Sequence, residues 1–305
     1  MTSLDETYYS LLPEVAEALE HGKPIVALES TVITHGLPFP DNQQLASEVE
    51  REIREVGCVP ATIAILDGKI CLGIDQQQLE QLVQAKELLK VSVRDIAIAV
   101  SARKTGGTTV AGTLAVAQAA GIKVFATGGI GGVHRGSAFD VSADLQELRR
   151  AQLVVVCAGA KAILDIPATL EVLETLGVPV IGYHTDYFPG FYSANSGYPV
   201  SSRVDSPEEV AKLAQVQWRL GQTSAILVAV PPPAEIALSK DVVEAAIKTA
   251  IEDAQRMNIH GQAVTPYLLR RVSEMTGGAS LKANLGLLSN NARIAAQIAK
   301  AIYNQ

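Results

Sequence analysis

The chain has 305 residues, of which 48% are hydrophobic and 19% are charged, the balance of a globular protein with a sizeable core rather than of a disordered chain. Its formal net charge of −7 leaves no basic surplus for a phosphate backbone, which excludes nucleic acid as the main partner but not a small phosphorylated ligand. No apolar stretch reaches the roughly 18 residues of a membrane helix, and the first ten residues lack the apolar run of a signal peptide, so we expect no membrane partner.

Short apolar runs alternate with helical patterns along the chain, which predicts an α/β protein. The first buried strand is expected at residues 25–29. We expect Asp41 to cap the helix that follows and Gly57 to end it. The apolar residues that recur on one face of this helix are Leu45, Val49, Ile53 and Val56.

The dipeptide Asp67-Gly68 stands between the apolar runs 61–66 and 69–73. It is a strong signal for a two-residue type I′ hairpin, which pairs its strands antiparallel. We therefore expect a mixed sheet rather than a purely parallel one. The later strands are expected at 123–127, 153–158, 179–183 and 225–230.

Three further helices are predicted from their opening residues and periodicity. In Ser206-Pro207-Glu208-Glu209 the serine is a cap, the proline takes the first helical position, and Glu209 can close a capping box. Thr265-Pro266 is expected to open a helix in the same way, and 280–303 fits a long amphipathic helix. Because no repeat or linker interrupts the chain, we predict one domain over 1–305, with 1–23 as an N-terminal extension or helix.

Two segments in the first half carry candidate ligand-binding groups. Glu29 stands where a buried strand gives way to a polar turn, and strand ends are where α/β folds bind ligands. The alternative is that Glu29 caps a nearby backbone or pairs with an arginine. The loop Gly106-Gly107-Thr108-Thr109 precedes a helix of small residues, whose N–H groups could bind a phosphate. An ordinary glycine loop with a helix cap is the alternative there.

A second glycine-rich loop, 127–136, follows a predicted strand. It does not match the dinucleotide-binding pattern GxGxxG, because His134 occupies the position of the last glycine and no helical pattern opens there. Downstream, Asp140, Ser142 and Asp144 could hold a hard cation and sugar hydroxyls. Alternatively, Ser142 caps a helix over 143–149 with Asp144 in its first turn, which explains Asp140 less well.

Lys161 follows a continuous apolar strand through Ala158-Gly159-Ala160. Such surroundings desolvate the ammonium, lower its pKa and free the amine to form a Schiff base, whereas the plain alternative is a surface lysine at a strand end. Cys157 in the same strand has no histidine or charged neighbour and is expected to be a small core residue. The three cysteines of the chain form no CxxC pair, so we expect neither disulfides nor structural zinc, and a cytoplasmic location.

Taken together, these segments resemble the pseudouridine-5′-phosphate glycosidase family, also called indigoidine synthase A-like proteins. The similarity runs from about Pro24 to the C-terminus, and so many blocks in order exclude a chance match. The blocks that carry it include ALESTVITHGLPFP, VPATIAILDGKI, KVSVRD, GGTTVAGT, FATGGIGGVHRG, FDVSADLQEL, VVCAGAKAILDIPATLE, GYHTDYFPGFY, RVDSPEEVA, AVTPYLLRRV and NNARIAAQIA.

The resemblance implies a three-layer α/β/α fold with a mixed, mostly parallel sheet, assembled as a homotrimer. Glu29 matches the proton donor, Lys161 the nucleophile, and Asp140 the ligand of one Mn²⁺ per subunit. The positions that match substrate contacts or border the site are Lys90, Thr109, Val110 (through its backbone), His134, Ser142, Ala143, Asp144 and Asn290. The segment from His134 to Asp140 is shorter than the family pattern, which implies a tighter loop at the metal site.

The activity that the resemblance implies is the reversible cleavage of the C–C bond of pseudouridine 5′-phosphate in pseudouridine catabolism. Its products are uracil and ribose 5-phosphate, formed through a lysine–ribose imine. Two other functions stay open at this point. One is a Schiff-base aldolase that acts on a sugar phosphate without a uracil pocket or a metal. The other is a non-catalytic sugar-phosphate sensor, against which the coexistence of Glu29, Asp140 and Lys161 argues.

Overall fold

The computed structural model describes residues 4–85, 87–136, 140–259 and 263–304. Its centre is a mixed sheet in the strand order β1-β4-β3-β2-β7-β9-β13-β11-β12, with β6 paired to β3 and β5 paired to β6. The strands are β1 (Tyr9–Leu11), β2 (Ile25–Leu28), β3 (Val59–Leu66), β4 (Lys69–Leu72), β5 (Leu89–Val91), β6 (Gly106–Thr108), β7 (Val124–Ala126), β8 (Val133–His134), β9 (Val154–Cys157), β10 (Leu164–Asp165), β11 (Val180–Tyr183), β12 (Ser202–Val204) and β13 (Ile226–Ala229).

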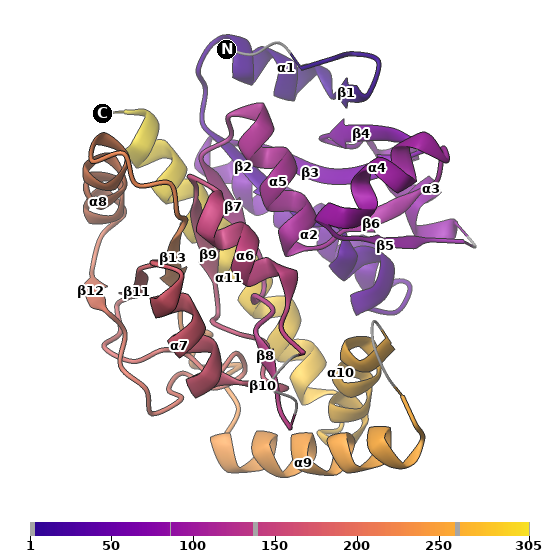
Figure 1. Cartoon of the computed structure of the whole chain (residues 1–305), viewed down its shortest axis with the longest axis vertical. Helices are drawn as coiled ribbons and strands as arrows, with labels where there is room; N and C mark the ends of the chain where they lie inside the picture. The colour runs from indigo at the N-terminus through magenta and orange to yellow at the C-terminus, as the bar shows by residue number, and fades with distance from the viewer. Residues whose placement is uncertain (1–3, 86, 137–139, 260–262, 305) are drawn as a thin grey trace.

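Helices cover both faces of this sheet, as Figure 1 shows. The longest, α11, packs beside α2 and α8 on one face and contacts β7 and β9, while α5 and α6 pack together on the other face. The helical elements are α1 (Pro13–Glu20), the π-helical turn η1 (Val32–Gly36), α2 (Asp41–Val56), α3 (Gln76–Gln84), α4 (Val93–Ser101), α5 (Val110–Ala120), α6 (Ala143–Arg150), α7 (Ile166–Thr175), α8 (Pro207–Arg219), α9 (Lys240–Arg256), α10 (Val264–Met275) and α11 (Ala279–Tyr303). The three-layer α/β/α fold with a mixed, mostly parallel sheet is confirmed.

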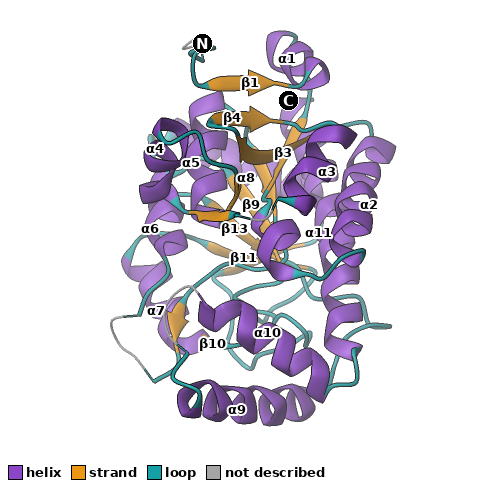
Figure 2. Ribbon diagram, turned by 90° about the vertical axis from the view of Figure 1, so that its right-hand side faces the viewer, coloured by secondary structure: helices purple, strands orange, loops and turns teal. Residues whose placement is uncertain are grey.

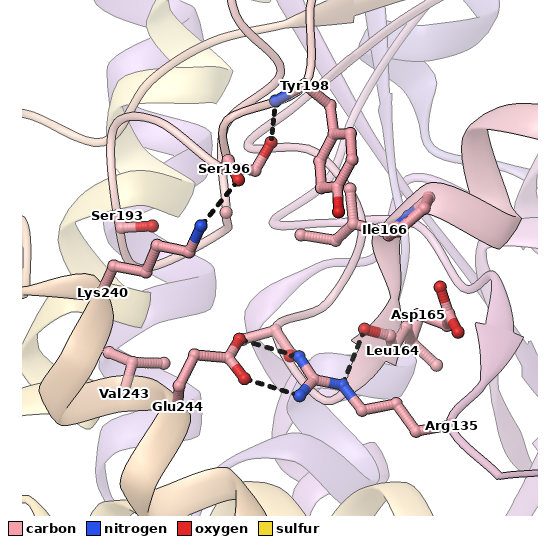
Figure 3. Close-up of a pocket in the computed structure, with 13 residues that line it drawn as sticks. Arg135, Leu164, Asp165, Ile166, Ser193, Ser196, Tyr198, Lys240, Val243 and Glu244 are labelled. Atoms are coloured by element: carbon pink, nitrogen blue, oxygen red, sulfur yellow. Dashed lines mark hydrogen bonds and ion pairs between the residues drawn. The ribbon is translucent and has the colours of Figure 1, made fainter.

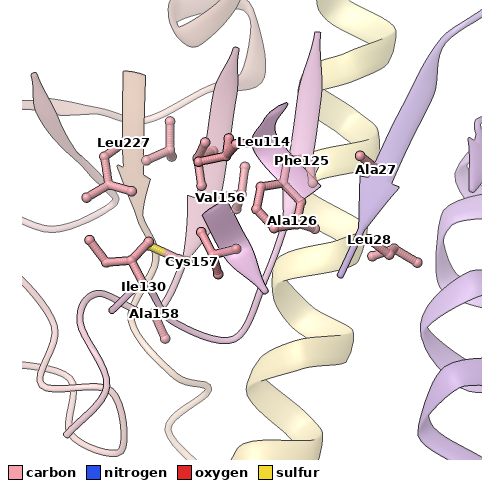
Figure 4. Packing of buried hydrophobic residues seen from close by; sticks show 14 of the residues in the cluster. Ala27, Leu28, Leu114, Phe125, Ala126, Ile130, Val156, Cys157, Ala158 and Leu227 are labelled. Atoms are coloured by element: carbon pink, nitrogen blue, oxygen red, sulfur yellow. The ribbon is translucent and has the colours of Figure 1, made fainter. Parts of the chain in front are cut away.

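The core lies along the parallel strands β2, β7, β9 and β13, whose residues are all buried. Both faces of each strand are apolar because helices cover both faces of the sheet. Figure 4 shows the result around Phe125 and Val156, with α11 passing behind the strands. These four strands therefore form a rigid base, and the site lies beyond their carboxyl ends.

The strands predicted from the sequence are all present; β3 begins two residues earlier than predicted, and the others are shorter by one or two residues. The Asp67-Gly68 hairpin is confirmed: β3 and β4 pair antiparallel, and the two turn residues have φ of 50° and 81°. The sequence did not indicate β1, which adds a parallel edge strand beside β4. Nor did it indicate β8 and β10, a short antiparallel pair that joins two loops.

Three predicted helix starts differ in detail from the structure, although α8 begins at Pro207 as expected. Asp41 is the first residue of α2 and Pro40 precedes it as N-cap, although Gly57 does end that helix in the left-handed region at φ 93°. Ser206 caps α8 through the N–H of Glu209 at 3.2 Å, but the Glu209 carboxylate accepts from Asp205 instead of closing a capping box.

The predicted start of α10 is also shifted, because this helix begins at Val264, one residue before Thr265-Pro266. Pro266 remains in the first turn of the helix, where its missing N–H leaves no intrahelical bond unmade. Figure 2 shows α9 and α10 together at the end of the molecule opposite β1 and α1. Among the described residues, no helix is long and apolar enough to cross a membrane.

Candidate active site

Three of the predicted functional side chains meet at one cavity. Glu29 directly follows β2, Lys90 lies in β5, and Lys161 lies in the loop after β9. All three line the same cavity. The residues come from segments far apart in the sequence. The parallel strands β2 and β9 bring Glu29 and Lys161 to one edge of the sheet, whereas β5, which carries Lys90, runs in the opposite direction.

Glu29 is buried, and its Oε1 accepts a hydrogen bond of 2.5 Å from the Thr127 hydroxyl. Burial raises the pKa of this carboxyl, while the positive charge of Lys161 and the Thr127 hydrogen bond act in the opposite direction. The net shift keeps a proton on the side chain at a higher pH than an exposed glutamate would allow. Glu29 is therefore equipped to act as a general acid.

Lys90 and Lys161 place two ammonium groups at the same cavity. Burial lowers the pKa of Lys90, and the charge of Lys161 lowers it further, whereas Asp144 and Glu29 oppose the shift. The position of Lys161 is set by its backbone, since its N–H donates to the carbonyl of Ile130 at 3.0 Å.

Asp144 joins the two glycine-rich segments. Its Oδ1 accepts from the N–H of Ala111 at 2.9 Å, and its Oδ2 accepts from the N–H of Gly131 at 2.7 Å. A Cβ added to Gly131 would lie 2.6 Å from Asp144 Oδ2, so this contact requires glycine. Since backbone donors occupy both carboxylate oxygens, the side chain fixes the start of α5 against the second glycine loop.

The hydroxyls next to these loops act as helix caps. Ser142 Oγ accepts from the N–H of Asp144 at 3.2 Å, which confirms the capping interpretation for Ser142 and for the first-turn position of Asp144. Thr109 Oγ1 accepts from the N–H of Gly112 at 3.2 Å at the start of α5. The predicted contacts Val110 and Ala143 are the first residues of α5 and α6, so both belong to helix N-termini, where backbone N–H groups attract anions.

His134 and Asp140 are joined through their backbones, because the N–H of His134 donates to the carbonyl of Asp140 at 2.9 Å. Burial lowers the pKa of His134; the carboxylate of Asp140 opposes this, and the charges of Lys90 and Lys161 add to it. These four groups therefore lie within electrostatic reach of one another. The predicted shortening of the loop concerns residues 137–139, which lie outside the described residues.

Asp140 is exposed and offers one carboxylate to a metal ion. Within the described ranges, no three His, Cys, Asp or Glu side chains converge on one point, so these residues do not form the ligand set of a structural zinc. A single carboxylate does fit Mg²⁺ or Mn²⁺, which keep much of their water shell and take one or two protein oxygens.

Only Glu29, Lys90 and Lys161 of the predicted site residues line the cavity, and Asn290 is among those that do not. Its Oδ1 accepts a hydrogen bond of 2.9 Å from Arg293 on the same helix. Asn284 and Leu288 of α11 line the cavity instead. Asn291, which shares their helix face, donates from Nδ2 to the carbonyl of Thr127 at 2.9 Å. The spacing 284, 288 and 291 follows the helical period and could have indicated this face from the sequence.

The remaining walls of the cavity were not expected from the sequence. Gly129 packs against the ring of Phe191, and a Cβ at this glycine would lie 2.6 Å from that ring. Facing the sheet edge, α10 contributes Thr265, Pro266 and Leu269. The cavity thus combines an acid and two amines on one side with apolar walls on the other, which suits a phosphorylated sugar that carries a flat ring.

Comparison with known proteins gives a consistent result. The sequence profile of the family described as "Indigoidine synthase A like protein" matches residues 14–301. A "Pseudouridine-5′-phosphate glycosidase" of Herpetosiphon aurantiacus is 52% identical over 295 residues, covering 96% of this chain and 97% of the relative. The protein of the same name from Geobacillus kaustophilus is 52% identical over 291 residues, covering 95% and 97%.

Two solved structures share the fold over almost the whole chain. The prealnumycin C-glycosynthase AlnA, solved in complex with ribulose 5-phosphate, superposes with a TM-score of 0.91 at 38% identity, covering 99% of this chain and 98% of that one. An indigoidine synthase A-like protein from Thermotoga maritima gives a TM-score of 0.91 at 36% identity, covering 99% of both chains.

Proposed function

The chain belongs to the indigoidine synthase A-like family, and on this basis we propose that it is a pseudouridine-5′-phosphate glycosidase. It splits the C–C bond between uracil and ribose 5-phosphate. The observation that carries the proposal is the convergence of Glu29, Lys90 and Lys161 at one cavity, in a chain about half identical to relatives of that name. The bound sugar phosphate of the AlnA structure supports a ligand of the same class.

A C–C glycosidic bond cannot be broken by protonating a leaving nitrogen, so the sugar ring has to open first. Glu29, whose pKa is raised by burial, gives its proton to the ring oxygen as the bond from that oxygen to C1 breaks. Electrons from the uracil ring compensate the electron deficit that develops at C1. The acid therefore acts on the sugar oxygen and not on the base.

Lys161 then supplies the electron pair for cleavage. Its neutral amine adds to C1 and forms a C–N bond. The added nitrogen releases one proton and C5 of uracil takes one up, so the two changes balance, and the bond from C1 to C5 breaks as the nitrogen lone pair forms a C=N bond. Water adds to the resulting imine, and ribose 5-phosphate leaves with regeneration of the amine. Each step is reversible, so synthesis from uracil and ribose 5-phosphate is expected as well.

We place the phosphate at Lys90, which lines the cavity and lies in β5 beside the start of α5, where the N–H of Thr109 donates to the carbonyl of Val91 at 2.9 Å. The Lys90 ammonium is a compact positive charge, and the helix N-terminus at Thr109 and Val110 adds fixed positive dipole ends. Ser142 and Ala143 at the start of α6 and the nearby His134 complete the set of contacts that the family resemblance supports. Asp144 acts indirectly, by holding the α5 backbone in place.

Asp140 would hold one divalent ion, Mn²⁺ or Mg²⁺, largely hydrated. Such an ion supplies positive charge that orients substrate oxygens near the reacting carbon. This assignment is supported by the exposed carboxylate of Asp140, because its oxygens are the kind of ligand that Mn²⁺ and Mg²⁺ prefer. The family resemblance also supports a homotrimer, and the three buried, unpaired cysteines support a cytoplasmic location.

The function is tested by incubating the protein with pseudouridine 5′-phosphate and Mn²⁺ while following free uracil. Uracil release with turnover supports the glycosidase. Binding without turnover would indicate a sensor, and cleavage of a sugar phosphate without release of uracil would indicate an aldolase.

The metal assignment is tested by removing the ion. We expect exhaustive chelation to abolish turnover, and added Mn²⁺ to restore it. Asp140→Asn should lower the affinity for Mn²⁺, measured directly by titration of the protein. Full activity of a protein shown to be free of metal would contradict the assignment.

A further inference from the structure

Arg135 lies directly after β8 and makes four hydrogen bonds from one guanidinium, shown in Figure 3. Nε donates to the carbonyl of Leu164 at 3.0 Å, and Nη2 donates to the carbonyl of Ala162 at 3.0 Å. The two carboxylate oxygens of Glu244, on α9, accept from Nη1 at 2.6 Å and from Nη2 at 2.9 Å. The planar fork of an arginine can serve three elements at once in this way, and a lysine cannot.

The two carbonyls that Arg135 holds belong to the turn immediately after Lys161. On its other side, this turn is fixed to the second glycine loop, because the N–H of Lys161 donates to the carbonyl of Ile130 at 3.0 Å. The N–H of Leu164 closes the turn on the carbonyl of Lys161 at 2.9 Å. Arg135 therefore completes a frame around the backbone that carries the reacting amine.

Glu244 connects this frame to the rest of the cavity. It lies in the first half of α9, and Arg135 lowers the pKa of its carboxyl, so the carboxylate stays ionised. The next helix along the chain is α10, and α9 and α10 together are called the hairpin below. An ion pair of 2.9 Å between Arg271 and Asp253 ties the two helices together. Since α10 lines the cavity and Glu244 of α9 binds Arg135, these two helices connect the cavity wall with the lysine turn.

We propose that Arg135 and Glu244 are a positioning pair for the reaction. Glu244 orients the guanidinium, the guanidinium holds the carbonyls of Ala162 and Leu164, and the held turn sets the approach of the Lys161 amine to C1 of the sugar. This inference rests on the proposed function, in which Lys161 is the nucleophile. It assigns Arg135 no contact with the substrate. Small displacements of a reacting group cost much of the rate, so the pair should affect imine formation more than substrate binding.

The test compares three variants of the full chain. Arg135→Lys keeps the charge but cannot bridge the two carbonyls and the carboxylate, and Glu244→Gln keeps an acceptor but loses the charge. Arg271→Lys is the matched control, because it weakens an arginine ion pair in the same hairpin without touching the lysine turn. Each variant is assayed for steady-state kinetics, and for the rate of borohydride-trapped adduct formation with ribose 5-phosphate. Thermal unfolding and hydrogen exchange of the peptide that contains 161–165 are measured alongside.

We expect Arg135→Lys to slow adduct formation and kcat by about 10- to 100-fold with little change in KM, and Glu244→Gln to slow them less, by about 3- to 10-fold. Exchange in 161–165 should become faster in Arg135→Lys and stay as in the wild type in Arg271→Lys. The proposal is overturned if Arg135→Lys keeps wild-type kcat, or if its loss equals that of Arg271→Lys at the same unfolding temperature. A wild-type protein that releases no uracil would refute the proposed function, whereas unchanged exchange in Arg135→Lys would refute the positioning pair alone.

Discussion

The two sides of the cavity are built differently. On the sheet side, the groups that react are attached to strands with hydrogen-bonded neighbours on both edges: β2 lies between β3 and β7, and β9 lies between β7 and β13. Glu29, which directly follows β2, therefore projects from a base that cannot shift without breaking several ladders, and Lys161 is held in the turn after β9 by the bond from its N–H to the carbonyl of Ile130. Binding sites on such regular elements hold a more precise geometry than sites on loops.

On the hairpin side, α9 and α10 contribute walls rather than reacting groups. Only Leu268 and Val272 are buried among the described residues of α10, and the cavity-facing Leu269 is half-exposed. The sheet edge therefore carries the reacting groups. The hairpin shapes the space for the substrate and, through Glu244, holds the lysine turn in place. Substitutions of the reacting groups at the sheet edge should therefore lower kcat, whereas substitutions in the hairpin wall should mainly raise KM.

Lys161→Ala should have the largest effect. Loss of the nucleophile removes the electron route for C–C cleavage, so we expect kcat to fall by at least about 10⁴-fold. Lys161→Arg should fail as well, because a guanidinium stays protonated and cannot attack. Unchanged thermal unfolding and circular dichroism serve as the control for folding. Substantial activity in Lys161→Ala would show that Lys161 is not the nucleophile.

Glu29→Gln should lower kcat by about 10²- to 10⁴-fold, because the amide cannot donate the proton to the ring oxygen. In the wild type, activity should fall as the pH rises through the raised pKa of Glu29, since the acid is then ionised. Thr127→Val removes a hydrogen bond that lowers this pKa, so this alkaline limb should move to higher pH. A pH–rate profile measures both effects, and an alkaline limb unaltered in Glu29→Gln would assign it to another group.

Glu29→Gln should also change the stability of the fold, and the sign of the change follows from the burial of Glu29. Because the pKa of Glu29 is higher in the folded than in the unfolded chain, the wild type loses stability as the pH rises through the folded pKa. The amide introduced by the substitution does not titrate. Glu29→Gln should therefore unfold at a higher temperature than the wild type at about pH 9. The difference in unfolding temperature between the two should be smaller at about pH 4. The opposite trend would show that the lysines, rather than burial, dominate at Glu29.

Lys90→Ala should act mainly on the substrate phosphate. We expect kcat/KM for pseudouridine 5′-phosphate to fall by about 10- to 100-fold, with most of the loss in KM, since a charged hydrogen bond is removed. The wild type should use unphosphorylated pseudouridine far less well, and Lys90→Ala should narrow that difference. Equal efficiency of the wild type on the nucleoside and its phosphate would reject the phosphate role of Lys90.

Leu269→Ala on the hairpin side should have the smallest effect. It removes part of an apolar wall, so KM should rise by about 2- to 5-fold while kcat stays close to that of the wild type. Steady-state kinetics beside Lys90→Ala make the comparison direct. If Leu269→Ala lowered kcat as strongly as a substitution at the sheet edge, the division between the two sides would be wrong.

The same division explains what the sequence could predict. Glu29 and Lys161 are candidates because each follows an apolar run that predicts a buried strand and hence an edge of the sheet, whereas their roles as acid and nucleophile come from the family resemblance. Ser142 was recognised as a cap because capping is local in sequence. These inferences needed only neighbouring residues.

What the sequence could not predict depends on distant partners. Asp144 binds the N–H of Ala111, which lies 33 residues away, and Arg135 pairs with Glu244, which lies 109 residues away. No periodicity or local motif encodes such pairs, because folding alone brings them together. Asn290 illustrates the converse: its motif was recognised, but the rotation of α11 turns Asn284 towards the cavity instead.

The central claim is that Lys161 forms a covalent imine with the sugar. The most direct test is to incubate the protein with ribose 5-phosphate, reduce with borohydride, digest, and locate the adduct by mass spectrometry. The account predicts a mass increase of one reduced ribose 5-phosphate on the peptide that contains Lys161, and no adduct in Lys161→Ala. An adduct on Lys90 or Lys104, or uracil release with no trappable adduct, would contradict it.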